Sequence, residues 1–230
     1  SIDNFKEFNN MILLGSNAAN NYYSNLLQFL PRIFFIKDEK IKLGIHRNSS
    51  TKFREFIKLI LDSRNIKFSF LYLDDGFYKF IDCQIPQFLD MQKSIKLLKR
   101  YLLPKNLKSE DKKIYLTRED SDYRKIINEA DIMPILRSKG YKVINPQLYS
   151  IDEQIKIFSQ ADKIIAPHGS NLANIIFCKP GTEIYEVGPT FNENYEKIFE
   201  NRYKLLADIN NLKYFRFLTD TVPVKKHSDL

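Results

Sequence analysis

Strand-like and helix-like segments alternate in the second half of the chain, and this alternation restricts the fold more than any other feature of the sequence. Four short apolar segments fit strands, at 114–116, 141–144, 164–166 and 183–187. Segments with helical signals separate them, and strands that alternate with helices form parallel sheets covered by helices. We therefore predict an α/β domain with ligands at the carboxyl ends of its strands, where Arg118, His168 and Glu186 fall.

The helices between these strands carry recognisable start signals. A capping box begins at Ser150. An earlier helix is expected to be capped by Asn128 or Asp131, and its Pro134 is tolerated only near the first turn. A last helix is expected over 192–211.

The first half of the chain has a similar but less regular pattern. Helices are expected at 20–30, from a cap at Thr51, and over the lysine-rich stretch 90–103. Strands are expected at 32–36, 42–45, 66–73 and 78–81. The first half therefore also reads as α/β.

A polar stretch at 105–113 is the best linker candidate. The 230 residues, 43% of them hydrophobic, suffice for one large domain or two small ones of about 100 residues each. We predict two α/β halves facing a cleft. The halves are an N-terminal domain over 1–107 and a C-terminal domain over 108–192, and a helix with a tail follows over 193–230.

Charge and composition narrow the partners without choosing among them. A formal net charge of +8 indicates an anionic partner, which could be nucleic acid, a membrane surface or a phosphorylated substrate. The lysines of the 90–103 helix fit either a solvated helix face or a nucleic-acid patch. No apolar run approaches the ~18 residues that span a bilayer, and no signal peptide begins the chain. Two cysteines suit a reducing compartment, and a first residue other than Met indicates a trimmed or processed N-terminus.

The segment 163–174 has the pattern of an anion-binding turn. An apolar strand ends in a His-Gly-Ser turn, and a helix can begin from Asn171. The first N–H groups of a helix are unpaired, and its dipole favours negative charge. Gly169 allows the backbone to approach a ligand, and His168 and Ser170 add side-chain donors. An ordinary strand-to-helix loop is the alternative.

We find no metal site in the sequence. Asp120 and Asp122 form a D-x-D, and Asp74 with Asp75 follows an apolar strand. Both pairs are more typical of turns or helix caps, because Asp makes local hydrogen bonds there. The three histidines lack the spacing of metal ligands. We therefore expect neither a metal nor another cofactor.

Six motifs occur in order and at close spacing in the second half. They are YLTR at 115–118, RKIINE at 124–129, GYKVINP at 140–146, IDEQIKIFSQA at 151–161, HGSNLANIIF at 168–177 and IYEVGP at 184–189. The first half adds NYYSNLLQFLPR at 21–32. Together these segments resemble glycosyltransferase family 61, well in the second half and thinly in the first.

The resemblance implies the GT-B fold, in which two Rossmann-like domains face each other and the C-terminal one holds a nucleotide-sugar. Family members invert the anomeric centre and generally need no metal. The expected donor site consists of Arg118, Arg124 and Asn128 at the nucleotide-sugar, His168, Gly169, Ser170 and Asn171 at the diphosphate, and Glu186 near the ribose or sugar hydroxyls. Arginine, helix-terminal N–H groups and a histidine donor can stabilise a leaving diphosphate without a metal.

These residues also have structural interpretations. Arg118 and Arg124 could be surface ion-pair partners, and Asn128 could be only an N-cap. His168 could be an ordinary loop histidine. Glu186 lies within an apolar strand, where a carboxylate is costly unless it is paired.

The first half is expected to bind the acceptor, through Asn21, Ser24, Gln28 and Arg32. Ser24 stands where the family often has histidine, and Gln28 stands where an acid is usual. If those positions supply or orient the catalytic base, this chain has its base elsewhere or is impaired. In the second half, Ser170 replaces the commoner alanine and adds a donor.

The candidate catalytic residues are His168 and Asp75. Inversion by single displacement needs a base opposite the leaving diphosphate. His168 is expected beside the phosphates, which is the wrong side for that role. Asp75, or Asp74 beside it, follows the strand at 66–73 and could point into the cleft, although a turn role is the alternative.

The sequence therefore predicts an inverting, metal-independent hexosyl- or pentosyltransferase. Its donor would be a UDP-linked sugar, and its acceptor a glycan or lipid-linked saccharide in surface polysaccharide synthesis. We expect a cytoplasmic protein with peripheral membrane contact and no nucleic-acid partner. The alternatives are a basic α/β module that binds nucleic acid or an anionic surface, and a catalytically impaired family member.

Overall fold

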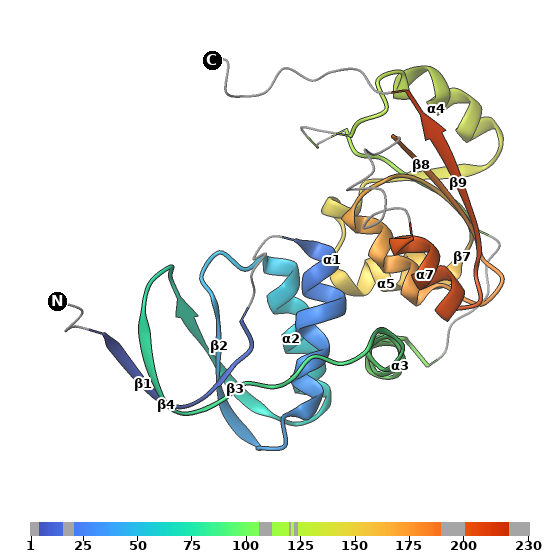
Figure 1. Cartoon of the computed structure of the whole chain (residues 1–230). Coiled ribbons are helices and arrows are strands. Elements are labelled where there is room, and N and C mark those ends of the chain that lie inside the picture. Colours follow the sequence, from blue (N-terminus) through green and yellow to red (C-terminus); the bar gives the residue numbers. More distant parts are fainter. Residues whose placement is uncertain are drawn as a thin grey trace, which may run out of the picture. The chain divides into compact units, whose positions relative to one another are not determined.

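Figure 1 shows a computed structural model of the chain, which describes residues 5–15, 21–105, 112–119, 121, 124–189 and 201–220. The chain divides into two compact units, with the division between Leu103 and Pro104. Among the described residues, each unit contains one sheet, and all strand pairs in both sheets are parallel. The predicted α/β class is therefore confirmed.

The sheet of the first unit has the strand order β3-β2-β1-β4. Its strands are β1 (Lys6–Leu13), β2 (Lys40–His46), β3 (Lys67–Leu73) and β4 (Tyr78–Gln84). The chain runs outward from β1 to β3 and then places β4 on the other side of β1, so the strand order reverses between β1 and β4. Ligands of open α/β sheets bind at such reversals, at the carboxyl ends of the strands.

Residues 22–35 of the first unit form one helical segment of three types. They comprise α1 (Tyr22–Ser24), the π-helix η1 (Asn25–Phe29) and the 3₁₀-helix η2 (Leu30–Phe35). The strand expected at 32–36 is therefore wrong. Pro31 lies in the first turn of η2, where proline is tolerated, and Ile33 continues the buried apolar face of the segment.

The other two helices of the first unit are confirmed, and both have side-chain caps. In α2 (Thr51–Ser63), the cap is Ser50 rather than the expected Thr51. Ser50 has an extended backbone and accepts a hydrogen bond from the N–H of Phe53 at 3.2 Å, whereas Thr51 is already helical. In α3 (Met91–Leu102), Asp90 accepts from the N–H of Lys93 at 2.8 Å.

The sheet of the second unit has the strand order β6-β5-β7-β8-β9. Its strands are β5 (Lys112–Leu116), β6 (Tyr141–Ile144), β7 (Ala161–Pro167), β8 (Glu183–Pro189) and β9 (Lys213–Thr219). The first four match the predicted strands, and β9 adds an edge strand that was not predicted. The order reverses between β5 and β7, as in doubly wound folds.

The described helices of the second unit lie on both faces of its sheet. They are α4 (Glu129–Ser138), η3 (Pro146–Leu148), α5 (Ile151–Gln160), η4 (Ser170–Phe177) and α7 (Arg202–Ile209). Right-handed crossovers place α4 on one face and α5, η4 and α7 on the other. Both α5 and α7 pack against η4, and Figure 1 shows α4 apart from them.

The helices α4, η4 and α7 differ in detail from what the sequence predicts. Pro134 lies at the sixth residue of α4, beyond the first turn, in a helix without buried residues whose freed carbonyl can bind water. The helix after the His-Gly turn is confirmed, but it is of the 3₁₀ type and begins at Ser170. Of the helix expected at 192–211, the structure describes α7, and 192–200 lies outside the described residues.

The capping box at Ser150 is confirmed and supplies a stability prediction. The N–H of Ser150 donates to Glu153 Oε2 at 2.8 Å, and the N–H of Glu153 donates to Ser150 Oγ at 3.3 Å. We expect Ser150→Ala to lower the free energy of unfolding, measured by urea denaturation, by about 1 kcal/mol. The control is Ser138→Ala in α4, whose hydroxyl only donates back to the Ile135 carbonyl; an equal loss in both variants would contradict the capping role.

Candidate functional site

The carboxyl ends of β5 and β7 bring two predicted site segments together. Adjacent pairing of these strands places Thr117 and Arg118, which follow β5, beside His168 and Gly169, which follow β7. The strand order reverses between the same two strands. The described part of this unit therefore has its anion-binding sequence pattern at the position where sheets of this type bind ligands.

Arg118 lies directly against the backbone of Gly169. A Cβ atom at position 169 would lie 1.8 Å from Arg118 Nη1 and 2.9 Å from its Cζ. The φ angle of Gly169 is 176°, which any residue can adopt, so glycine is needed here for space rather than for conformation. Nη2 of the same guanidinium donates to Ser121 Oγ at 2.8 Å. The guanidinium is thus held over the turn that begins η4.

His168 and Glu186 form a buried pair beneath this turn. His168 Nδ1 is hydrogen bonded to one carboxylate oxygen of Glu186, and the two side chains are only 2% and 1% exposed. The Tyr214 hydroxyl donates to the other oxygen. Burial raises the pKa of Tyr214, and the charge of Glu186 raises it further, so this hydroxyl remains a donor. The pairing that a carboxylate within an apolar strand requires is therefore present.

A second tyrosine connects this pair to the turn. The ring of Tyr203 on α7 meets the His168 ring edge-on, with centroids 5.3 Å apart, and its hydroxyl donates to the Gly169 carbonyl at 2.7 Å. The N–H of His168 donates to the Val187 carbonyl on β8 at 2.7 Å. Both the backbone and the side chain of His168 are therefore held by contacts within the unit.

The residues that begin η4 are more accessible than His168. Ser170 and Asn171 are half-buried, and the first intrahelical bond runs from the N–H of Leu172 to the Gly169 carbonyl at 2.9 Å. The N–H groups of Ser170 and Asn171 precede that bond and have no partner within the helix. Together with Arg118, they are the groups of this turn best placed to meet an anion.

Two residues at the end of β5 and one on α4 form a network that the sequence did not predict. Glu129, the first residue of α4, accepts from the hydroxyls of Tyr115 at 2.5 Å and Thr117 at 3.0 Å. Burial raises the pKa of Tyr115, and its hydrogen bond to Glu129 raises it further. The network ties the end of β5 to α4 immediately before Arg118. Glu129 is the last residue of the RKIINE motif, but its hydrogen-bond partners lie on a different element and follow only from the tertiary structure.

Arg124 and Asn128 lie on the surface of the loop between β5 and α4. Both side chains are exposed, and Arg124 has a positive φ of 58°. Asn128 occupies the N-cap position of α4, which was one of the two expected positions, but its side chain makes no capping hydrogen bond. The alternative cap, Asp131, lies inside the helix.

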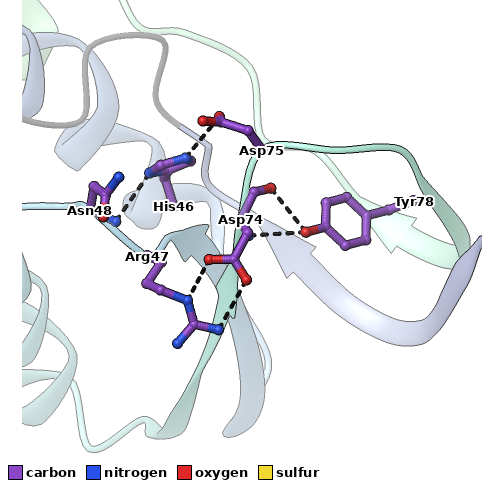
Figure 2. A network of polar contacts seen from close by, with 6 residues as sticks. All are labelled: His46, Arg47, Asn48, Asp74, Asp75 and Tyr78. Atoms are coloured by element: carbon purple, nitrogen blue, oxygen red, sulfur yellow. Dashed lines mark hydrogen bonds and ion pairs between the residues drawn. The ribbon is translucent and has the colours of Figure 1, made fainter.

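In the first unit, the carboxyl ends of β2 and β3 carry the polar network of Figure 2. Asp74 binds the Arg47 guanidinium through both carboxylate oxygens, the longer bond being 3.1 Å. The Tyr78 hydroxyl donates to the Asp74 carbonyl at 2.9 Å. The hydrogen bond from Arg47 holds the pKa of Asp74 below its usual range, and this carboxylate is fully engaged.

Asp75 differs from its neighbour in having a single polar contact with the described residues. Its Oδ1 lies 3.1 Å from His46 Nε2, and its side chain is 98% exposed. The N–H of Asn48 donates to His46 Nδ1 at 3.1 Å, so the neutral ring carries its proton on Nε2 and donates it to Asp75. Figure 2 shows Asp75 pointing away from Asp74 and toward His46. One carboxylate oxygen of Asp75 is thus oriented, and the other faces solvent.

The expected acceptor residues all lie on or beside the helical segment 22–35. Asn21 caps α1, because its side chain accepts from the N–H of Ser24 at 3.0 Å. Ser24 is half-buried, Gln28 is exposed and Arg32 is buried. The segment passes through a π-helical turn at 25–29, a geometry that is often found at functional sites.

Among the described residues, no group of three or more histidine, cysteine or acidic side chains is arranged so that it could hold a metal ion. Asp120 and Asp122 of the D-x-D lie outside them. Within the same part of the chain, no helix has the length and hydropathy needed to cross a membrane.

Comparison with known proteins identifies one family. No curated protein matches the sequence. A family model described as Glycosyltransferase 61 matches residues 22–185, which include both the helical segment of the first unit and the turn over which Arg118 lies. Because this match extends over more than half of the chain, the protein belongs to glycosyltransferase family 61.

Proposed function

We propose that the protein is an inverting glycosyltransferase of the GT-B type that transfers a hexose or pentose from a UDP-linked donor to a glycan hydroxyl. Membership in the family supports glycosyl transfer in general. The observation that carries the donor assignment is the contact between the Arg118 guanidinium and the Gly169 backbone, at the strand-order reversal of the second sheet. A guanidinium beside helix-terminal N–H groups suits a diphosphate.

In this proposal, Arg118 and the N–H groups of Ser170 and Asn171 bind the diphosphate. They stabilise the charge that develops on it as it leaves, which is the task that a metal performs in other transferases. His168 and Glu186 contact each other below the turn and hold it in shape. Because both Glu186 oxygens already accept internal hydrogen bonds, we assign Glu186 a positioning role rather than the ribose contact.

Arg124 and Asn128 complete the donor site on the nucleotide side. They are exposed and lie in the loop that follows Arg118, within reach of a nucleotide bound at the carboxyl end of β5. The Asn128 side chain makes no capping hydrogen bond in the described part of the chain, and its amide can therefore hydrogen bond with a ligand.

We propose Asp75 as the catalytic base. In a single displacement, the base takes the proton of the acceptor hydroxyl, the hydroxyl oxygen bonds to the anomeric carbon, and the bond from that carbon to the diphosphate oxygen breaks. UDP leaves with the electron pair. Asp75 fits this role better than Asp74, because one of its oxygens has no partner among the described residues and His46 orients the other. The bond to Arg47 makes Asp74 the weaker base.

The acceptor is assigned to the first unit, through the segment with Asn21, Ser24, Gln28 and Arg32. A base on the loop after β3 accounts for the serine and glutamine found at positions 24 and 28. We propose a glycan or lipid-linked saccharide as the acceptor, in the synthesis of surface polysaccharide. The charge of +8 favours peripheral contact with an anionic membrane from the cytoplasmic side.

A ligand-stabilisation experiment tests the proposed function. We expect UDP at 100 times its Kd to stabilise the full chain by about 2.7 kcal/mol, seen as a rise in melting temperature, with no comparable effect of oligonucleotides. Steeply salt-dependent binding of DNA or RNA without a response to UDP would instead support the basic binding module.

The contact between Arg118 and Gly169 predicts a non-additive pair of variants. With excess chelator present, Arg118→Ala is expected to lower kcat/KM about 10²-fold, because one stabilising donor to the leaving group is lost. Gly169→Ala should cost about as much, since its Cβ displaces the guanidinium. The double variant should be no worse than either single variant, because the clash disappears with the arginine. Multiplication of the two losses would show that Gly169 acts independently of Arg118.

Neighbouring carboxylates provide a matched test of the base. Asp75→Asn is expected to lower kcat by about 10² or more, because the amide cannot accept the proton. The same change at Asp74, which removes an exposed ion pair with Arg47, should leave kcat within a few fold of the wild type. If Asp75→Asn retains kcat while UDP still binds, Asp75 is not the base. If Asp74→Asn is inactive and Asp75→Asn is active, Asp74 is the base instead.

A further inference from the structure

Arg32 lies at the strand-order reversal of the first sheet. Its Nε donates to the Pro86 carbonyl at 2.6 Å, and its Nη1 donates to the Leu14 carbonyl. Leu14 follows the end of β1, and Pro86 follows the end of β4 shortly after. Because β1 and β4 are the strands between which the order reverses, the guanidinium occupies the position in this unit that Arg118 occupies in the other.

The charge of Arg32 has no acidic partner in the described part of the chain. Its side chain is buried, with the residue 5% exposed, and its polar contacts are the two carbonyls. The guanidinium also lies over the ring of Phe88, 4.6 Å from the centroid, and 5.9 Å from that of Phe29. Burial lowers the pKa of Arg32. Carbonyls and rings supply only partial negative charge, and a buried cation normally requires a full one.

We propose that Arg32 binds an anionic group, a carboxylate or a phosphate, on the acceptor substrate. A guanidinium has five N–H donors in a planar fork, and the two carbonyls use only some of them. Both carboxylate and phosphate match that fork. The ring of Phe88 is 59% exposed, so the guanidinium lies just below the surface, where a small anion can reach it. The name acceptor rests on the proposed function, whereas the anion site does not.

A purely structural role for Arg32 would be to join the ends of β1 and β4. That role needs two N–H donors; the charge strengthens their hydrogen bonds to the carbonyls but costs free energy on burial without a full counter-charge. A neutral donor would serve it at lower cost. The structural role predicts no binding of anions, and this difference can be measured.

The chain contains no tryptophan, so Phe88→Trp places the protein's single tryptophan over the Arg32 guanidinium, where its fluorescence can be excited selectively. We propose to titrate this variant of the full chain with glucuronate, inorganic phosphate and glucose at constant ionic strength. Saturating UDP is present so that the donor site is occupied. A saturable change with glucuronate or phosphate, and none with glucose, is expected. Tighter binding of glucuronate would indicate an acceptor with an acidic sugar, and tighter binding of phosphate would indicate a phosphorylated acceptor.

Two further variants locate the response. Arg32→Lys in the Phe88→Trp background keeps the charge but loses the planar fork. We expect it to lower the affinity for the anion at least about 10-fold. Phe215→Trp places the reporter in the second unit, on β9, and should show no response. If Arg32→Lys does not fold, the titrations of Phe88→Trp and Phe215→Trp decide the question alone.

The inference is overturned if neither anion changes the fluorescence of folded Phe88→Trp, if glucose acts equally, or if Arg32→Lys binds the anion unchanged. Failure of the proposed function has a different signature. If UDP does not bind by calorimetry, the same titrations are repeated in the Arg118→Ala background, where the anion response at Phe88→Trp must persist for Arg32 to be its site. An anion response that disappears with Arg118→Ala would assign the anion to the second unit and contradict the inference.

Discussion

The carboxylate of Glu186 is buried within the second sheet and accepts hydrogen bonds from His168 and Tyr214. Removing a hydrogen-bond partner of a buried carboxylate is strongly destabilising, because the buried charge loses its compensation. His168 follows β7, Glu186 lies on β8 and Tyr214 on β9, so this one interaction connects three adjacent strands. It lies beneath the turn at Gly169 that begins η4 and against which Arg118 lies.

Both units use their parallel sheets in the same way. In each, the strand order reverses beside the first strand, and a guanidinium lies at the carboxyl edge of that reversal, Arg32 in one and Arg118 in the other. Helices leave in opposite directions at a reversal, so loops separate and backbone groups are open to a ligand. The environments of the two arginines differ. Arg118 lies over a glycine that opens a helix, whereas Arg32 is buried between carbonyls and rings.

The two acids after β3 show how a single neighbour changes the chemistry of identical side chains. Asp74 is engaged by Arg47 through both oxygens, which favours its charged form and weakens it as a base. Among the described residues, the polar partner of Asp75 is His46, whose tautomer is set by the Asn48 N–H. Their sequence context is the same, and only the positions of Arg47 and His46 at the end of β2 distinguish them.

The sequence by itself determined the α/β class, four strands of the second sheet, the Ser150 capping box and the anion-binding pattern at His168, because these follow from local periodicity and turn chemistry. It misread 32–36 as a strand, since an apolar run fits either period, and it missed β1 and β9, whose polar residues interrupt the alternation. Only the tertiary structure decided that Glu186 faces His168 and Tyr214, that Arg118 contacts Gly169, and that Arg32 binds backbone carbonyls just beyond the ends of β1 and β4. These pairs come from different strands and helices, and which of them meet depends on strand order and register, which no local pattern contains.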